Sequence, residues 1–224
     1  MTNEFQMPRP DERVLILGST GSGKTQMGVW LLSQAPFDRM PYVMIDYKRD
    51  KLIGEIKGKR EITLDEMPKE PGLYHLKPNP VSDDEKIEDW LLRAWHRRAI
   101  GLYVDEALRL PTKRTGAFES ILTQGRALYI PVISLSQRPV DLTRYAFSET
   151  NHVIVFRLTD LRDRKKVGEY VPIDTDYKLK KFHSLWYNVD QHASFGVKPA
   201  PDRQTILATF KDRLKALGRT REVI

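Results

Sequence analysis

A glycine-rich octapeptide between an apolar run and an amphipathic segment constrains the fold of this chain more than any other feature. Gly18–Thr25 reads GSTGSGKT and satisfies the pattern G-x-x-x-x-G-K-[ST]. Arg13–Leu17 before it (RVLIL) favours a buried strand, and Lys24–Gln34 after it favours a helix. Glycines at the start of a helix let several backbone N–H groups converge, and the helix dipole there favours an anion. The sequence therefore predicts a phosphate-binding loop and a bound nucleoside triphosphate.

Each residue of this loop has an expected role at the nucleotide. Lys24 would reach the β- and γ-phosphates, and the Thr25 hydroxyl would complete the ligand shell of a Mg²⁺ ion. The predicted nucleotide-binding residues are Gly18, Ser19, Thr20, Gly21, Ser22, Gly23, Lys24 and Thr25.

Short apolar runs alternate with longer amphipathic segments along the rest of the chain. Further buried strands are expected at Tyr42–Asp46, Gly101–Asp105, Ile130–Ser136 and His152–Phe156. Further helices are expected at Asp83–Arg98, Gly116–Leu128 and Thr159–Tyr170. Such alternation predicts an α/β fold with a mainly parallel sheet and helices on both faces.

The carboxyl-terminal third is expected to extend this core. Leu185–Val189 and Ser194–Val197 predict a small β-hairpin, and Asp202–Leu217 predicts a terminal helix. We expect a single domain over residues 1–224, with its core at about 13–158 and a C-terminal extension at about 159–224.

Composition excludes several classes of protein. The chain has no Cys, which excludes disulfides, thiolate metal sites and cysteine nucleophiles. Its longest uncharged stretches, Gln26–Phe37 and Ala127–Gln137, are shorter than the roughly 18 apolar residues that a membrane helix needs. The first residues lack the apolar core of a signal peptide. We therefore expect neither a transmembrane segment nor secretion.

Two carboxylates follow the expected strand at Gly101–Asp105. In a parallel sheet, Asp105 and Glu106 would end up beside the phosphate loop. Asp105 could hold Mg²⁺, and Glu106 could orient and deprotonate a water, which favours hydrolysis over phosphoryl transfer to a metabolite. The alternative is that the pair merely caps the following helix.

A polar residue follows the expected strand at Ile130–Ser136. If that strand lies between the strand of the phosphate loop and the strand of Asp105, Gln137 would face the γ-phosphate. An amide both donates and accepts, so Gln137 could sense this phosphate and position water.

These segments together resemble the FtsK–HerA superfamily of ring-forming, DNA-translocating ATPases. The phosphate loop, MIDYKRD at Met44–Asp50, YVDEA and GRALYIPVISLSQRP occur in the family's order and span about Val14–Arg157. Tyr47 departs from the Pro that the DNA-segregation members usually carry. The resemblance implies a RecA-like P-loop NTPase fold, ATP as the nucleotide, and a homo-oligomer, usually a hexameric ring around double-stranded DNA.

The resemblance also implies roles for individual residues. Thr25 and Asp105 match the metal ligands, and Glu106 matches the catalytic base. Gln137 matches the polar sensor.

Two arginines are candidates for a finger that reaches a neighbouring subunit's nucleotide. Arg126 matches the position from which family members can present such a finger, and Arg138 is the second candidate. The alternative for Arg126 is an ordinary solvated arginine near a helix end.

In size and motifs the chain looks most like the genome-packaging ATPases of tectivirus-like phages, which carry an internal membrane, and of related archaeal icosahedral viruses. This branch implies packaging of double-stranded DNA into a preformed capsid. It also implies capsid or vertex proteins as partners, and a location in the host cytoplasm or at the packaging vertex of the virion. The alternatives are a cellular motor for DNA segregation, repair or conjugation, and a P-loop kinase for a nucleotide or small molecule.

The net charge of +7 is unevenly distributed. Residues 1–106 hold 16 Lys+Arg and 18 Asp+Glu, a net charge of −2, whereas residues 107–224 hold 21 and 12, a net charge of +9. This pattern indicates a near-neutral nucleotide-binding half joined to a basic half that meets the nucleic acid.

The basic half begins with the loop at Ala107–Gly116. Arg109, Lys113 and Arg114 in this loop are predicted to grip DNA phosphates without reading the base sequence. The alternative is an ordinary solvated loop. Other basic clusters, including the one around Lys48, are interleaved with acids and are expected to be solvated surface.

Overall fold

A single twisted sheet organises the chain. The structure is a computed structural model that describes residues 5–110, 116–176 and 178–222. Within these ranges the strands join in the order β3-β4-β2-β5-β6-β1-β7-β8-β9. The strands are β1 (Val14–Leu17), β2 (Pro41–Asp46), β3 (Arg60–Ile62), β4 (Gly72–Leu76), β5 (Gly101–Asp105), β6 (Val132–Ser136), β7 (His152–Val155), β8 (Ser184–Asn188) and β9 (Ala193–Val197).

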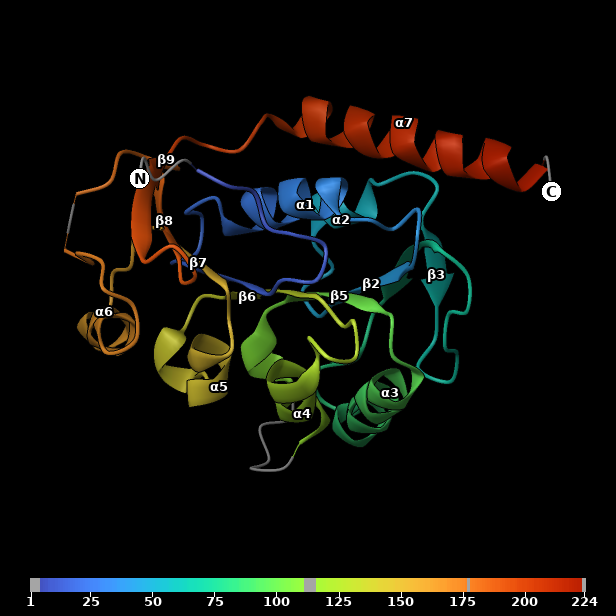
Figure 1. The fold of residues 1–224 in the computed structure, drawn as a ribbon, viewed down its shortest axis with the longest axis horizontal. Coiled ribbons are helices and arrows are strands. Elements are labelled where there is room, and N and C mark those ends of the chain that lie inside the picture. The colour runs from blue at the N-terminus through green and yellow to red at the C-terminus, as the bar shows by residue number, and fades with distance from the viewer. Residues whose placement is uncertain (1–4, 111–115, 177, 223–224) are drawn as a thin grey trace.

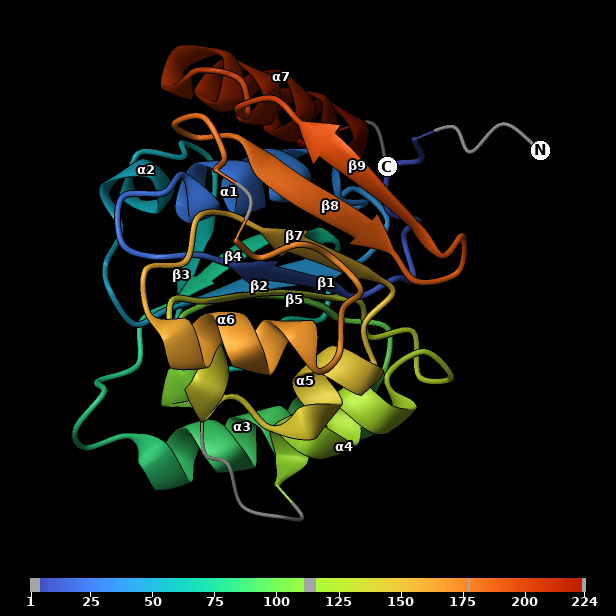
Figure 2. The ribbon, with the colours of Figure 1, turned by 90° about the vertical axis from the view of Figure 1, so that its left-hand side faces the viewer.

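Helices lie on both faces of this sheet (Figures 1 and 2). One face is covered by α1 (Lys24–Gln34), α2 (Lys51–Gly54) and α7 (Arg203–Glu222). The other is covered by α3 (Asp84–Arg97), α4 (Ala117–Gln124), α5 (Arg144–Ser148) and α6 (Leu161–Gly168). Two short 3₁₀ turns, η1 (Ala107–Arg109) and η2 (Pro139–Asp141), follow β5 and β6. The predicted mainly parallel α/β fold is confirmed.

Strand register brings the chemically important ends together. The strands from β3 to β7 across the sheet pair in parallel, and β8 and β9 add an antiparallel hairpin at one edge. Leu17 of β1 pairs with Ser136 of β6, and Asp46 of β2 pairs with Asp105 of β5. The predicted insertion of β6 between β1 and β5 is therefore confirmed.

Successive side chains of β1 pack in two separate apolar cores, one on each face of the sheet. Because successive strand residues point to opposite faces, Leu15 packs in the core that holds Trp90, and Ile16 packs in the core that holds Trp186. All four side chains are fully buried. This double burial explains why β1 reads as a continuous apolar run instead of an alternating one.

The terminal helix α7 packs on the chain's own core. Phe210 is buried and stacks on Phe37, with 6.0 Å between the ring centroids. Arg213 donates hydrogen bonds to the carbonyls of Ser33 and Ala35 at the end of α1, 2.6 Å and 2.8 Å away. A cation satisfying carbonyls at a helix C-terminus is favourable for both hydrogen bonding and the helix dipole.

Two differences from the sequence-based expectation have local causes. The segment between β2 and α3 contains β3 and β4, which the sequence did not predict because prolines surround these short strands. Helix α4 ends at Gln124 instead of Leu128. The Gly125 carbonyl accepts a hydrogen bond from the Ile130 N–H at 2.8 Å, which closes a turn that leads directly into β6. Among the described residues, no helix combines the length and apolar character that spanning a membrane requires.

Candidate nucleotide site

The loop between β1 and α1 needs glycine for its shape. Gly23 precedes α1 with a φ of 106°, a left-handed conformation that other residues adopt only with strain. A Cβ atom on Gly18 would lie 2.6 Å from Cβ of Phe156, too close for any side chain. These positions explain the glycines at both ends of the predicted phosphate loop.

The loop is anchored to the strands on either side of β1. Gly18 N–H donates to the Ser136 carbonyl at 3.3 Å, and Ser19 N–H donates to the Arg157 carbonyl at 3.1 Å. The Thr20 hydroxyl donates to Gln137 Oε1 at 2.7 Å. The loop is thus fixed to the ends of β6 and β7, and Gln137 lies beside it.

Lys24 lies in this loop with only 6% of its surface exposed. Its ammonium is 3.5 Å from the Ser19 carbonyl. Burial lowers the pKa of Lys24, the nearby Lys48 lowers it further, and Glu106 and Asp105 oppose both effects. A buried cation with carboxylates nearby is well suited to meet a polyanion, since bound phosphates would replace the water it has lost.

Asp105 ends β5 as a buried carboxylate that lacks a partner. It is 1% exposed, and within the described chain its Oδ2 has no hydrogen-bond partner. Burial raises the pKa of Asp105 to about 6, and the neighbouring carboxylates of Asp46 and Asp50 raise it too, while Lys48 lowers it. Such an oxygen beside a phosphate loop fits a divalent cation, which would remove the cost of burying the charge.

Glu106 follows with a backbone φ of 78°, a left-handed conformation that is uncommon for residues other than glycine. It is 2% exposed and forms an ion pair with Lys48. The Gln137 N–H donates to Glu106 Oε1 at 3.2 Å, and the Ser136 hydroxyl donates to the same oxygen at 3.4 Å. Glu106 occupies the N-cap position of η1 without a side-chain capping bond, so the capping alternative is wrong for this residue.

Lys48 is a site residue that sequence reasoning missed. It was expected on a solvated surface, and its side chain is indeed 38% exposed, but its ammonium also contacts the buried Glu106 carboxylate. The loop that carries it is tied down where Asp50 N–H donates to both oxygens of Asp46, at 3.2 Å and 3.1 Å. The signal that could have found it was the Asp-x-Lys pattern of Asp46 and Lys48 after β2.

A buried histidine contacts the carboxylate of Asp46, which holds the loop of Lys48. His75 of β4 places Nε2 3.1 Å from Asp46 Oδ2 and Nδ1 2.9 Å from Glu61 Oε1. The sequence assigned no chemistry to this residue, and no short-range spacing could have, because β4 meets β2 only through sheet pairing.

The two candidate finger arginines lie in different surroundings. Arg138 follows Gln137 and lies near three carboxylates, those of Asp141, Asp160 and Asp163, at 4.0, 3.5 and 3.5 Å. Arg126 lies at the opposite, amino-terminal edge of the sheet, and its side chain is 58% exposed. Its Nε is 4.0 Å from Asp11 Oδ2, just before β1. Arg126 is therefore remote from its own chain's phosphate loop.

The predicted DNA loop is described only in part. Arg109 is exposed on η1 at the same edge as the phosphate loop. Lys113 and Arg114 lie outside the described residues.

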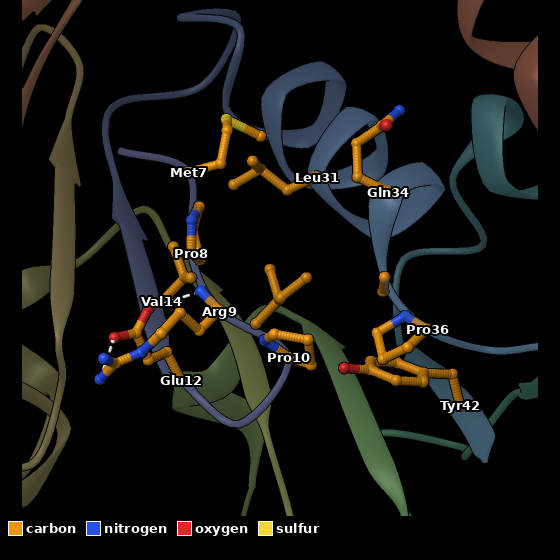
Figure 3. A pocket seen from close by; sticks show the side chains of 12 residues that line it. Met7, Pro8, Arg9, Pro10, Glu12, Val14, Leu31, Gln34, Pro36 and Tyr42 are labelled. Atoms are coloured by element: carbon orange, nitrogen blue, oxygen red, sulfur yellow. Dashed lines mark hydrogen bonds and ion pairs between the residues drawn. The ribbon is translucent and has the colours of Figure 1, made fainter. Parts of the chain in front are cut away.

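Two of the hollows lined by the described residues adjoin α1 and differ greatly in size. One of about 450 Å³ is lined by the phosphate loop, Lys48, Gln137, Phe182 and Arg203, and its volume falls in the roughly 300–1,000 Å³ range of ligand pockets. The other, of about 70 Å³, lies at the amino-terminal edge between Met7–Pro10 and α1 (Figure 3) and is too small for a nucleotide.

This fold, with a glycine-rich loop leading from its central β1 strand into α1, defines a RecA-like P-loop NTPase. The chain is 41% identical over 216 residues to the DNA packaging ATPase P9 of Enterobacteria phage PRD1, with 92% of this chain and 95% of that one covered. It belongs to this family of DNA packaging ATPases. No protein-family model matches the sequence.

Solved structures share the fold. The genome packaging NTPase B204 from Sulfolobus turreted icosahedral virus 2 superposes with a TM-score of 0.67 at 21% identity, over 86% of this chain and 99% of B204. EssC (ATPases 2 and 3) from Geobacillus thermodenitrificans superposes with a TM-score of 0.63 at 16% identity, over 96% of this chain and 45% of EssC. The predicted resemblance to viral genome-packaging ATPases is confirmed by the 41% identity to the PRD1 protein, and the two solved structures show that the fold is shared.

Proposed function

We propose that this chain hydrolyses ATP with Mg²⁺ and uses the energy to move double-stranded DNA into a preformed viral capsid. One observation carries the proposal: a phosphate loop and two buried carboxylates meet at one sheet edge, in a chain 41% identical to a DNA packaging ATPase. That family membership favours packaging over a cellular motor or a kinase.

Binding of the nucleotide is assigned to the loop Gly18–Thr25. Its N–H groups and the buried Lys24 ammonium would hold the phosphates at the start of α1. The Thr25 hydroxyl and the unpartnered Asp105 oxygen would hold Mg²⁺. When bound, this ion supplies positive charge that stabilises the transferring phosphoryl group.

Glu106 is assigned as the base. Lys48 and the Gln137 N–H hold its carboxylate beside the loop, so it can orient a water and accept its proton. Gln137 also accepts from Thr20 in the loop, so its amide links the base to the phosphate-binding segment. This supports its role as a sensor of the γ-phosphate.

We also propose a homo-oligomeric ring, which we expect to be hexameric, and the position of Arg126 supports it. An exposed arginine at the edge opposite its own loop can contact a nucleotide only in a neighbouring subunit. Arg138 is less suited to this role because its guanidinium already lies among three carboxylates.

DNA contact is assigned to the loop after Glu106. Arg109 on η1, with Lys113 and Arg114 beyond it, would bind backbone phosphates independently of base sequence. Capsid or vertex proteins would be further partners, in the host cytoplasm or at the packaging vertex. The continuous sheet supports our proposal that residues 1–224 form one domain.

The test is the rate of ATP hydrolysis with and without duplex DNA across a salt series. We expect stimulation by DNA that weakens as salt rises, because salt competes for the phosphate contacts. Lys24→Ala is the control and should lose hydrolysis under all conditions. A rate indifferent to DNA, together with phosphorylation of a nucleoside, would contradict the proposal and support a kinase.

A further inference from the structure

An exposed aromatic ring stands beside the phosphate loop, and the proposed hydrolysis does not use it. Phe182 lies just before β8 and leaves 43% of its surface exposed. Its Cδ1 would lie 3.4 Å from a Cβ placed on Gly23, so the ring reaches the first turn of α1. Phe182 also lines the hollow of about 450 Å³ together with the phosphate loop.

The backbone of Phe182 is in an unfavourable conformation. Its φ of 64° is left-handed, which is rare for a bulky aromatic residue. The fold therefore holds a strained residue in place and exposes its apolar ring to solvent. Strain of this kind concentrates at ligand-binding sites, because contact with a ligand can offset it.

Sheet order indicates which part of a nucleotide would meet this ring. Glu106 and Gln137 follow β5 and β6, on one side of β1, and mark the γ-phosphate end of the site. Phe182 precedes β8, on the other side of β1. A triphosphate lying along the loop with its γ-phosphate at Glu106 therefore directs its ribose and base toward Phe182.

We propose that Phe182 is the platform on which the base of the bound nucleotide stacks. This inference rests on the proposed function, in that the loop must bind a nucleoside triphosphate. The Lys181 ammonium lies 4.9 Å from the ring centroid, so one face of the ring already holds a cation. The other face is the one assigned to the base.

A platform of this kind binds a base without reading its edge. Every base has a π face, so stacking on an aromatic ring adds affinity with little selection among bases. The nearby Gln26 amide, which could read a base edge, instead donates to the Pro201 carbonyl at 2.6 Å. ATP and GTP should therefore both gain from Phe182.

The test compares nucleotide with inorganic tripolyphosphate, which has the phosphates and lacks the base. Dissociation constants for ATP, GTP and tripolyphosphate are measured by calorimetry, with Mg²⁺, on the full chain and on Phe182→Ala and Phe182→Trp. We expect Phe182→Ala to lower the affinity for ATP and for GTP by roughly 5- to 150-fold, the usual range for losing one stacking contact with a base. Tripolyphosphate affinity should not change, and Phe182→Trp should restore nucleotide affinity.

Tyr129→Ala is the matched control. Tyr129 is also exposed, at 67%, and also has a left-handed φ, of 54°, but it lies beside Ile130 at the far edge of the sheet. This variant should bind all three ligands as the parent does.

Two results would overturn the inference while leaving the proposed function intact. One is a loss of tripolyphosphate affinity in Phe182→Ala that equals the loss of ATP affinity, which would show that the ring only shapes the loop. The other is unchanged ATP affinity in that variant. Failure of the parent chain to bind any of the three ligands would instead refute the nucleotide site itself, and the base platform with it.

Discussion

Replacing Asp105 with Asn removes a negative charge that the folded chain buries beside other carboxylates. The pKa of Asp105 rises from 3.8 to about 6 in the fold, chiefly because of burial. A difference of about two pKa units, at 1.36 kcal/mol per unit, corresponds to about 3 kcal/mol of stability lost when the group is ionised. Replacing the carboxylate with an amide would remove this penalty, but the unpaired N–H donor of the amide would cancel part of the gain in stability. We therefore expect Asp105→Asn to raise the free energy of unfolding by about 1–3 kcal/mol near neutral pH.

The sign of the pH dependence follows from the raised pKa. Well below pH 3.8 the Asp105 carboxyl is protonated in both the folded and the unfolded chain, so it carries no penalty. As pH rises from about 4 to 6, the unfolded chain loses this proton first, and the folded chain becomes less stable relative to it. Above about pH 6 the full penalty is present. The gain from Asp105→Asn should therefore be large near pH 7 and several-fold smaller near pH 4.

The assay is urea unfolding of both proteins without nucleotide, near pH 7 and near pH 4. Asp65→Asn, at an exposed carboxylate, is the control and should leave the stability unchanged. Hydrolysis should be lost in Asp105→Asn, because the proposed metal ligand is gone. An asparagine variant that is no more stable than the parent near neutral pH would refute the reasoning, as would a gain of equal size near pH 4.

Three further predictions address the remaining parts of the site. Glu106→Gln should lower steady-state hydrolysis by roughly 10²–10⁴-fold, because it removes the base, while ATP binding measured by equilibrium dialysis persists; undiminished hydrolysis would contradict the assignment. Lys48→Met should destabilise the chain by about 1–3 kcal/mol in urea, since it leaves the buried Glu106 carboxylate without its cation. The double variant with Glu106→Gln should recover most of that loss, and a purely additive double variant would show that the two residues do not interact. Arg126→Ala and Lys24→Ala should each lack hydrolysis when assayed alone. A mixture of the two variants should regain some hydrolysis, because some interfaces then pair an intact phosphate loop with an intact arginine finger from the neighbouring subunit. No recovery at any mixing ratio would exclude a finger that acts in trans.

The phosphate loop and its flanking elements could be predicted because their determinants are local. Helix α1 spans Lys24–Gln34, as expected, since glycines before it and apolar residues within it specify its start and its buried side. The strands β2 and β5 were similarly clear from unbroken apolar runs. Short strands such as β3 could not be predicted, because three residues in an otherwise irregular segment carry no period of their own.

The chemistry available to this protein can be read from the chain alone: a phosphate-binding loop, two acids after an apolar strand, and a polar residue after the next strand. The tertiary structure alone decided which other residues join them. Lys48 meets Glu106 only because β2 pairs with β5, and Phe182 meets Gly23 only because β7 and β8 extend the sheet past the loop. The physical reason is that motif chemistry is set by neighbours along the chain, whereas burial and ion pairing depend on contacts between segments far apart in sequence, which form only when the sheet assembles.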